Sequence, residues 1–209
     1  AERNLVSGNS QNGIHVVAQY EDGEPWTNIG NKIVDLNIKE NYIGLNQIGT
    51  SKLGNGGSGI HMQRYQSQGT ISGNIISGNS RGINGVFIDD LPTETLSILN
   101  NKIGTGYDDS IDLGNNGYGI AIEGNTKVDI GAEGQGNLIK FNGDGLSLRI
   151  DDYDYPYHSL QANVSHNTIE SSDFPAIGIS VSLSQESPLS QIIINNNQIV
   201  DQDLGIEYS

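Results

Sequence analysis

The chain contains no cysteine, which excludes disulfide bridges, thiolate nucleophiles and cysteine-ligated metal sites. Basic residues are also scarce: 10 Lys and Arg stand against 25 Asp and Glu, giving a net charge of −15. This balance argues against nucleic acid and anionic membranes as partners, because phosphate binding needs clustered Lys and Arg. No apolar run approaches the length of a transmembrane helix, so we expect no membrane insertion.

Aromatic residues make up only 6% of the chain and apolar residues 34%, whereas glycine occurs 28 times. The apolar residues are mostly Ile, Leu and Val in short alternating runs, a pattern typical of strands. Apolar spacing typical of helices is rare and glycine interrupts it throughout. The composition therefore predicts an all-β protein with a narrow core rather than a disordered chain.

Two short sequence phrases recur seven times in the same order. The first is Asn-x-Ile or Asn-x-Val, and it begins at Asn4, Asn41, Asn74, Asn101, Asn137, Asn167 and Asn197. The second is Gly-aliphatic-x-aliphatic, with Tyr closing the last copy, and it begins at Gly13, Gly59, Gly85, Gly119, Gly145, Gly178 and Gly205. Internal repetition with a period of about 20 to 50 residues indicates a solenoid.

Each repeat has the material for one coil of such a solenoid. In the second phrase the aliphatic residues are two positions apart and face one side of a strand. A third strand precedes the Asn in several repeats, as at 36–38, 96–98 and 192–194. We therefore predict a single domain, residues 1–209, in which about seven coils of three short strands stack as a parallel β-helix. The Asn is expected at a bend, bonded to its copies above and below, and the Gly at a corner.

Neither end of the chain carries a recognisable cap. The first phrase begins at residue 4 and the last ends at Tyr208, with no amphipathic helix beside either. Uncovered edge strands are templates for association, and solenoids normally need caps. We expect either that the chain is a segment of a longer array, with neighbouring repeats as partners, or that copies associate end to end.

Alternate residues of the second phrase face solvent, so stacked coils should form columns of outward side chains. The first predicted column is His15, His61, Phe87, Ala121, Ser147, Ser180 and Glu207, and the second is Val17, Gln63, Asp89, Glu123, Arg149 and Ser182. Asp89 and Glu123 would lie about 5 Å apart, and could share acid and nucleophile roles on a sugar. Arg149 could bind a uronate carboxylate. An exposed salt-bridge ladder is the alternative.

Two acidic clusters could bind calcium through carboxylate oxygens. They are Asp108, Asp109 and Asp112 in one segment and Asp151, Asp152 and Asp154 in another. Neither has the EF-hand spacing, and the nonapeptide of calcium β-rolls is absent. Solvated acidic loops are the alternative.

Aromatic and histidine side chains supply the candidate ligand contacts. The aromatic residues that fall in predicted loops are Tyr20, Trp26, Tyr153, Tyr155 and Tyr157. Exposed Tyr and Trp are enriched at binding surfaces, and flat rings stack on sugars. His61, predicted to stack on His15, could contact a ligand or a metal. Without such a role these side chains only cover loop or subunit surface.

The order Asn-x-Ile-Gly-Thr, Leu-Gly-Asn, Gly-Ile, at residues 101–105 and 113–120, resembles repeats of large secreted bacterial surface proteins. Those repeats belong to right-handed parallel β-helix proteins of pectin-lyase-like architecture. The resemblance implies a right-handed, single-stranded β-helix in an extracellular or cell-surface protein. It specifies no activity, because this fold includes lyases, hydrolases, epimerases, adhesins and spacers. The Gly-His-Gly and Arg-Ile-Lys motifs of related hydrolases are absent.

The sequence therefore favours a non-catalytic extracellular module that acts as a structural rod, adhesin or fibre subunit and contacts polysaccharide. It needs no cofactor, although the acidic clusters could take calcium. The alternative is a fragment of a polysaccharide lyase, epimerase or hydrolase. Such an enzyme would act on an acidic glycan through Asp89, Glu123 and Arg149.

Overall fold

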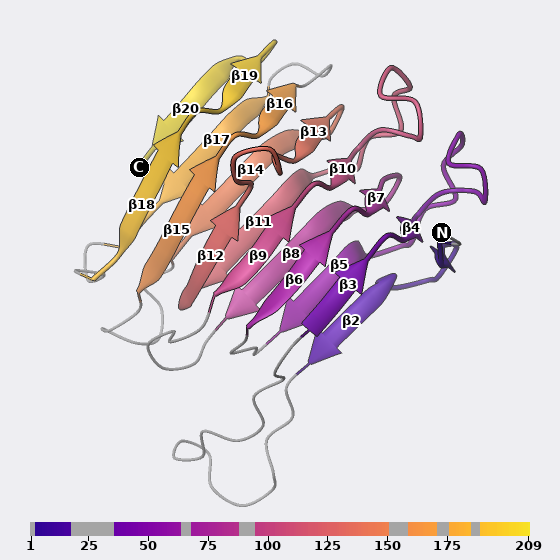
Figure 1. Cartoon of the computed structure of the whole chain (residues 1–209), viewed down its shortest axis with the longest axis horizontal. Coiled ribbons are helices and arrows are strands. Elements are labelled where there is room, and N and C mark those ends of the chain that lie inside the picture. Colours follow the sequence, from indigo (N-terminus) through magenta and orange to yellow (C-terminus); the bar gives the residue numbers. More distant parts are fainter. Residues whose placement is uncertain are drawn as a thin grey trace, which may run out of the picture.

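A computed structural model describes residues 3–17, 36–63, 68–87, 95–150, 159–170, 176–184 and 189–209. Within these residues the chain forms twenty strands and no helix. The strands stack in three parallel sheets along one axis, with the two termini at opposite ends of the stack (Figure 1). The predicted parallel β-helix with three strands per coil is confirmed.

Each sheet takes one strand from successive coils. Sheet A contains β1 (Leu5–Val6), β4 (Tyr42–Ile43), β7 (Ile75–Ile76), β10 (Lys102–Ile103), β13 (Leu138–Lys140), β16 (Thr168–Glu170) and β19 (Gln198–Val200). Sheet B contains β2 (Ile14–Val17), β5 (Ser58–Gln63), β8 (Arg81–Phe87), β11 (Tyr118–Gly124), β14 (Asp144–Arg149), β17 (Ile177–Ser182) and β20 (Leu204–Tyr208). Sheet C contains β3 (Leu36–Lys39), β6 (Gly69–Ser72), β9 (Leu96–Leu99), β12 (Thr126–Ile130), β15 (Leu160–Ser165) and β18 (Gln191–Asn195). The first coil therefore contributes described strands to sheets A and B only.

The core consists of columns of aliphatic side chains that run the length of the stack. One column, from sheet A, contains Val6, Ile43, Ile76, Ile103, Ile139, Ile169 and Ile199. Its five central members are fully buried, whereas Val6 and Ile199 at the two ends are only partly buried. Each buried aliphatic side chain contributes about 1.5–3 kcal/mol, so a chain with a modest apolar fraction still has a continuous core.

In the third coil the predicted position of the glycine phrase is wrong. The strand pairing aligns Ile83 with Ile60 and Ile120, so Gly82, not Gly85, occupies the corner position. A shift of three residues also exchanges the inward and outward faces of the strand. Phe87, predicted to face solvent, is 1% exposed, and its ring fills the core space left by Gly85.

The first-phrase asparagines form a buried ladder, as predicted. The side-chain Nδ2 of each donates to Oδ1 of the next at 2.9–3.0 Å, from Asn4 to Asn197. Oδ1 of Asn101 also accepts the backbone N–H of Asn74, and Nδ2 of Asn101 donates to the carbonyl oxygen of Ile71. The ladder thus satisfies the backbone polar groups that this bend would otherwise leave without water.

A second ladder runs along the bend between sheets A and B. It contains Asn9, Asn55, Asn79, Asn115 and Asn142, with side-chain bonds of 2.8–3.1 Å. The spacing of these asparagines differs from coil to coil because two coils carry longer loops before them, so the repeat pattern predicted only the first ladder. Every coil from the first to the fifth is linked through both bends.

Several ladder residues follow a residue in the left-handed conformation. At the first bend these preceding residues are Glu40, Gly73, Asn100, His166 and Asn196, with φ between 52° and 65°. Such φ values cost an ordinary residue about 1–2 kcal/mol, and glycine almost nothing. The bends are therefore strained wherever glycine is missing, and the ladder must over-determine them.

Asn101→Ala should lower the free energy of unfolding by on the order of 3 kcal/mol, because it leaves buried donors and an acceptor without partners. Urea unfolding followed by circular dichroism measures this. The exposed Asn4, with one bond along the ladder, is the matched control. Asn4→Ala should cost less than about 1 kcal/mol. Equal costs for the two variants would contradict a stabilising ladder.

His166→Gly should stabilise the fold by up to about 1 kcal/mol, because it relieves the φ of 59°. The side chain is exposed, so its removal loses little packing. The reverse change, Gly73→Ala, should destabilise by a similar amount, since its new Cβ meets only an ordinary contact at 3.5 Å. Melting temperatures that move in the same direction in both variants would refute strain at this bend.

Candidate functional site

The outer face of sheet B holds the described part of the predicted enzyme site. Its second column runs Val17, Gln63, Val86, Glu123, Arg149 and Ser182. Glu123 and Arg149 are neighbours across paired strands, as predicted. On the other side of Glu123, however, lies Val86, which takes the place predicted for Asp89. Asp89 itself lies outside the described residues.

This register separates the acid pair on which the sugar chemistry depends. A retaining or inverting glycosidase needs two carboxyl groups at a defined separation, and the described strands provide one, Glu123. Glu123 is partly buried and Arg149 is exposed. What the described column offers is an acid beside a base on adjacent strands, an arrangement worth little to stability at a surface.

The first outward column begins with a histidine pair. The rings of His15 and His61 lie 5.0 Å apart between centroids, tilted by 37°. In the third coil the column continues with Asn84, not with Phe87 as predicted. The side-chain nitrogen of Asn84 donates to Nδ1 of His61 at 2.9 Å. That contact requires a lone pair on Nδ1, so His61 carries its proton on Nε2 when neutral.

The surroundings of His61 favour the neutral ring. Burial lowers its pKa first, because it penalises the charged form, and the positive charges of His15 and Arg81 lower it further. The bond from Asn84 acts against these effects. A cationic neighbour and an occupied Nδ1 leave Nε2 as the nitrogen available to a ligand.

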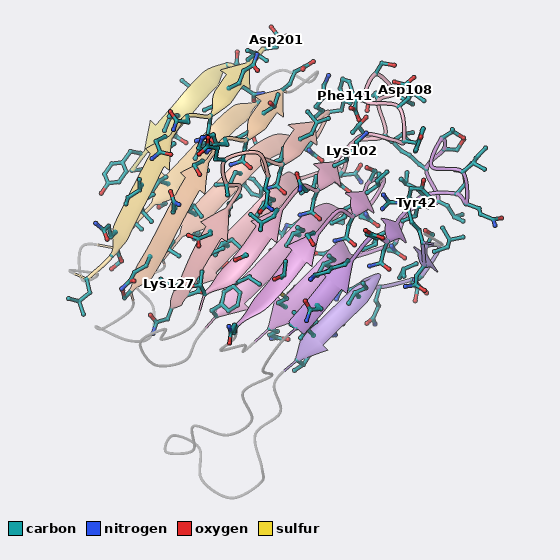
Figure 2. The ribbon with its side chains drawn as sticks, viewed as in Figure 1. Tyr42, Lys102, Asp108, Lys127, Phe141 and Asp201 are labelled. Atoms are coloured by element: carbon teal, nitrogen blue, oxygen red, sulfur yellow. The ribbon has the colours of Figure 1, made fainter. Side chains whose placement is uncertain are left out.

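The first acidic cluster lies in one of two long loops that project from sheet A, 45–53 and 105–113. Figure 2 shows Asp108 there, on the same side of the stack as Tyr42 and Lys102. Each carboxylate already has a local partner: Asp108 accepts from the N–H and hydroxyl of Ser110, Asp109 pairs with Lys102, and Asp112 accepts from the N–H of Gly114. The bonds from Ser110 lower the pKa of Asp108.

The carboxylates therefore point to separate partners. Among the described residues no three His, Asp or Glu side chains lie close enough to share a metal ion. Asp151, Asp152 and Asp154, the second candidate calcium cluster, lie outside the described residues, as do the candidate ligand residues Tyr20, Trp26, Tyr153, Tyr155 and Tyr157.

The two long loops also create a surface that the sequence interpretation missed. The N–H of Tyr107 donates to the carbonyl oxygen of Gly49 at 2.9 Å, which joins the loops across the shorter third coil. Beneath them Leu45, Ile75 and Leu113 form a small second core against the outside of sheet A. Ile48 and Tyr107 remain 68% and 69% exposed at the loop tips. We name Tyr42, Ile48 and Tyr107 the loop patch.

Contacts at the loop patch hold its rings in place. Gly49 lies between the two tyrosines, since a Cβ there would be 3.2 Å from Cε1 of Tyr42 and 3.4 Å from Cβ of Tyr107. Arg3 stacks over Tyr42, 5.2 Å from the ring centroid. The matching loop sequences, Ile-Gly through Leu-Gly-Asn, were visible in the sequence, but the pairing of two loops from alternate coils was not.

Comparison of the chain with protein-family models, curated proteins and solved structures gives no match in any of the three. In the part of the chain that the structure describes, no helix is long and apolar enough to cross a membrane.

The free energy of unfolding should fall when the pH drops below the ordinary histidine pKa of about 6.5. Because folding lowers the pKa of His61, the unfolded chain binds more protons between the two values, so stability there rises with pH. The contribution is complete above the unfolded value and is lost as pH falls through the folded one. Urea titrations at several pH values measure it.

His61→Gln should remove this part of the pH dependence. His166→Gln is the control, since His166 is exposed and lies at a bend away from the pair. An unchanged pH slope in His61→Gln would show that the pair is not the source.

Proposed function

We propose that this chain is a non-catalytic structural module of a secreted or surface-attached protein, in which it forms a stiff rod. The observation that carries the proposal is the pair of buried asparagine ladders. Coils one to five are joined by side-chain bonds at two bends, and coils six and seven at one. In a stacked-repeat protein such neighbour contacts are the main source of stiffness and stability.

The resemblance to pectin-lyase-like β-helix repeats of bacterial surface proteins supports a place outside the cell. The large negative charge and the absence of cysteine agree with a soluble exterior protein that needs no disulfide. Calcium remains a proposed ligand of the acidic loops, without being required for the fold, because each described carboxylate has its own partner.

Contact with polysaccharide would use aromatic side chains on the outside of the rod. Within the described residues the loop patch offers one highly exposed ring, Tyr107, fixed by backbone bonds to both sides of its residue. Rings held in this way stack on sugars at low entropic cost. The aromatic residues of the segments 18–35 and 151–158 would extend such a surface.

The second candidate function is a lyase, epimerase or hydrolase acting on an acidic glycan. It is favoured by one observation, the adjacency of Glu123 and Arg149 on paired strands. In that case Glu123 would transfer the proton and Arg149 would hold the uronate carboxylate. The position of Val86 weakens this alternative, because the second acid would have to come from another segment.

A glycan array and an ultraviolet assay on uronate polymers, both run with and without calcium, separate the two functions. For a structural module we expect no new absorbance from unsaturated ends, and an identical result for Arg149→Ala. On the array we expect binding that Tyr107→Ala weakens severalfold. Chain cleavage that Arg149→Ala abolishes would overturn the structural proposal.

A further inference from the structure

The C-terminal end of the stack exposes residues that belong to the core. Ile206 and Tyr208 continue the inward columns of sheet B, where their neighbours Ile179 and Val181 are 0% and 1% exposed. In the last coil they are 54% and 74% exposed. The end of the stack is thus an apolar surface with unpaired strand edges from β18, β19 and β20.

Gly205 gives this end a specific shape. At each earlier corner a Cβ would come within 3.0 Å of the carbonyl oxygen of the corner glycine in the next coil, as at Gly145 (2.3 Å) and Gly178 (2.5 Å). The glycine is needed there because another coil lies directly on it. At Gly205 a Cβ would meet nothing within 4 Å. The last coil therefore keeps a corner shape that matters only beneath a further coil.

The first ladder is open at this end in the same sense. In each step of the ladder the Nδ2 of one Asn donates to Oδ1 of the next, and from Asn41 onward the backbone N–H does so too. Asn197 has the donors for another step, and the described residues place no eighth-coil side chain over it. At the other end Asn4 is exposed, with its Nδ2 donating inward to Asn41. Its Oδ1 is the acceptor that such a step requires.

We propose that a second copy of this chain stacks head to tail on the C-terminal coil, with β1 pairing to β19 and β2 to β20. The proposal rests on the rod function and names the partner of the rod. Asn197 of one copy then donates to Asn4 of the other, and the carbonyl of Gly13 lies over Gly205. The half-buried Val6, Ile14 and Val16 cover Ile206 and Tyr208. Such a heterologous contact repeats into a filament.

Two features make this contact weaker than a step within the chain. Sheet C has no described strand in the first coil, so β18 gains no partner and only two sheets continue. Each copy also carries a net charge of −15, so copies repel one another at low salt. Association should therefore increase with ionic strength, because salt screens the repulsion.

Sedimentation velocity and negative-stain microscopy of the full chain, at high concentration and high salt, test the proposal. We expect rods that grow in steps of about 34 Å, the height of seven coils. Gly205→Ala should keep the wild-type melting temperature and raise the dissociation constant at least tenfold, since its Cβ meets the neighbouring copy alone. Gly178→Ala is the matched variant. It should lower the melting temperature, because its Cβ meets the chain's own backbone.

Tyr208→Lys provides a second test from the exposed apolar surface, with Glu207→Gln on the outward face as a control of equal charge change. Association lost in the first variant and kept in the second supports the proposal. Wild-type chain that stays monomeric under these conditions overturns it, as does association that neither Gly205→Ala nor Tyr208→Lys weakens. These outcomes leave the rod function intact, because only the ultraviolet assay bears on catalysis.

Discussion

Everything in this fold depends on how the backbone turns between sheets without losing its hydrogen bonds. A coil with so little apolar material is narrow, so its bends lie against the core and out of reach of water. Asparagine meets this constraint because its amide has both a donor and an acceptor at the end of one short side chain. A left-handed residue placed just before it, such as Glu40 or His166, directs that amide along the stack.

Since the ladders and the aliphatic columns fix the interior, the outer surface and the loop lengths can differ between coils. The second bend is made by a few residues in some coils and by the long loops 45–53 and 105–113 in others, yet Asn79 and Asn115 still meet. The two long loops also contribute a core of their own around Ile75. Function in such a protein depends on what the surface presents, which is why the fold alone does not specify an activity.

The sequence predicted the fold well because its signals are local and repeated. The first-ladder asparagines and the Ile and Val columns recur in each coil, so an error in one repeat is corrected by the others. The candidate site depended on the register of one strand, where Gly82-Ile83-Asn84-Gly85 and Gly85-Val86-Phe87-Ile88 fit the pattern equally well. Only three-dimensional packing decides between them, because Gly82 must lie beneath the carbonyl of Gly119 while the ring of Phe87 needs the space beside Gly85.

The asparagine amides all have the same orientation. The backbone N–H of Asn41 needs an acceptor on Asn74, so each amide oxygen must face the preceding coil and each amide nitrogen the following one. Backbone bonds between coils run in both senses, for example from Tyr42 to Asn4 and from Gly13 to Ser58, and so largely cancel. The side-chain dipoles add instead, which makes the rod electrically polar, with a partial negative charge at its N-terminal tip and a partial positive charge at the other.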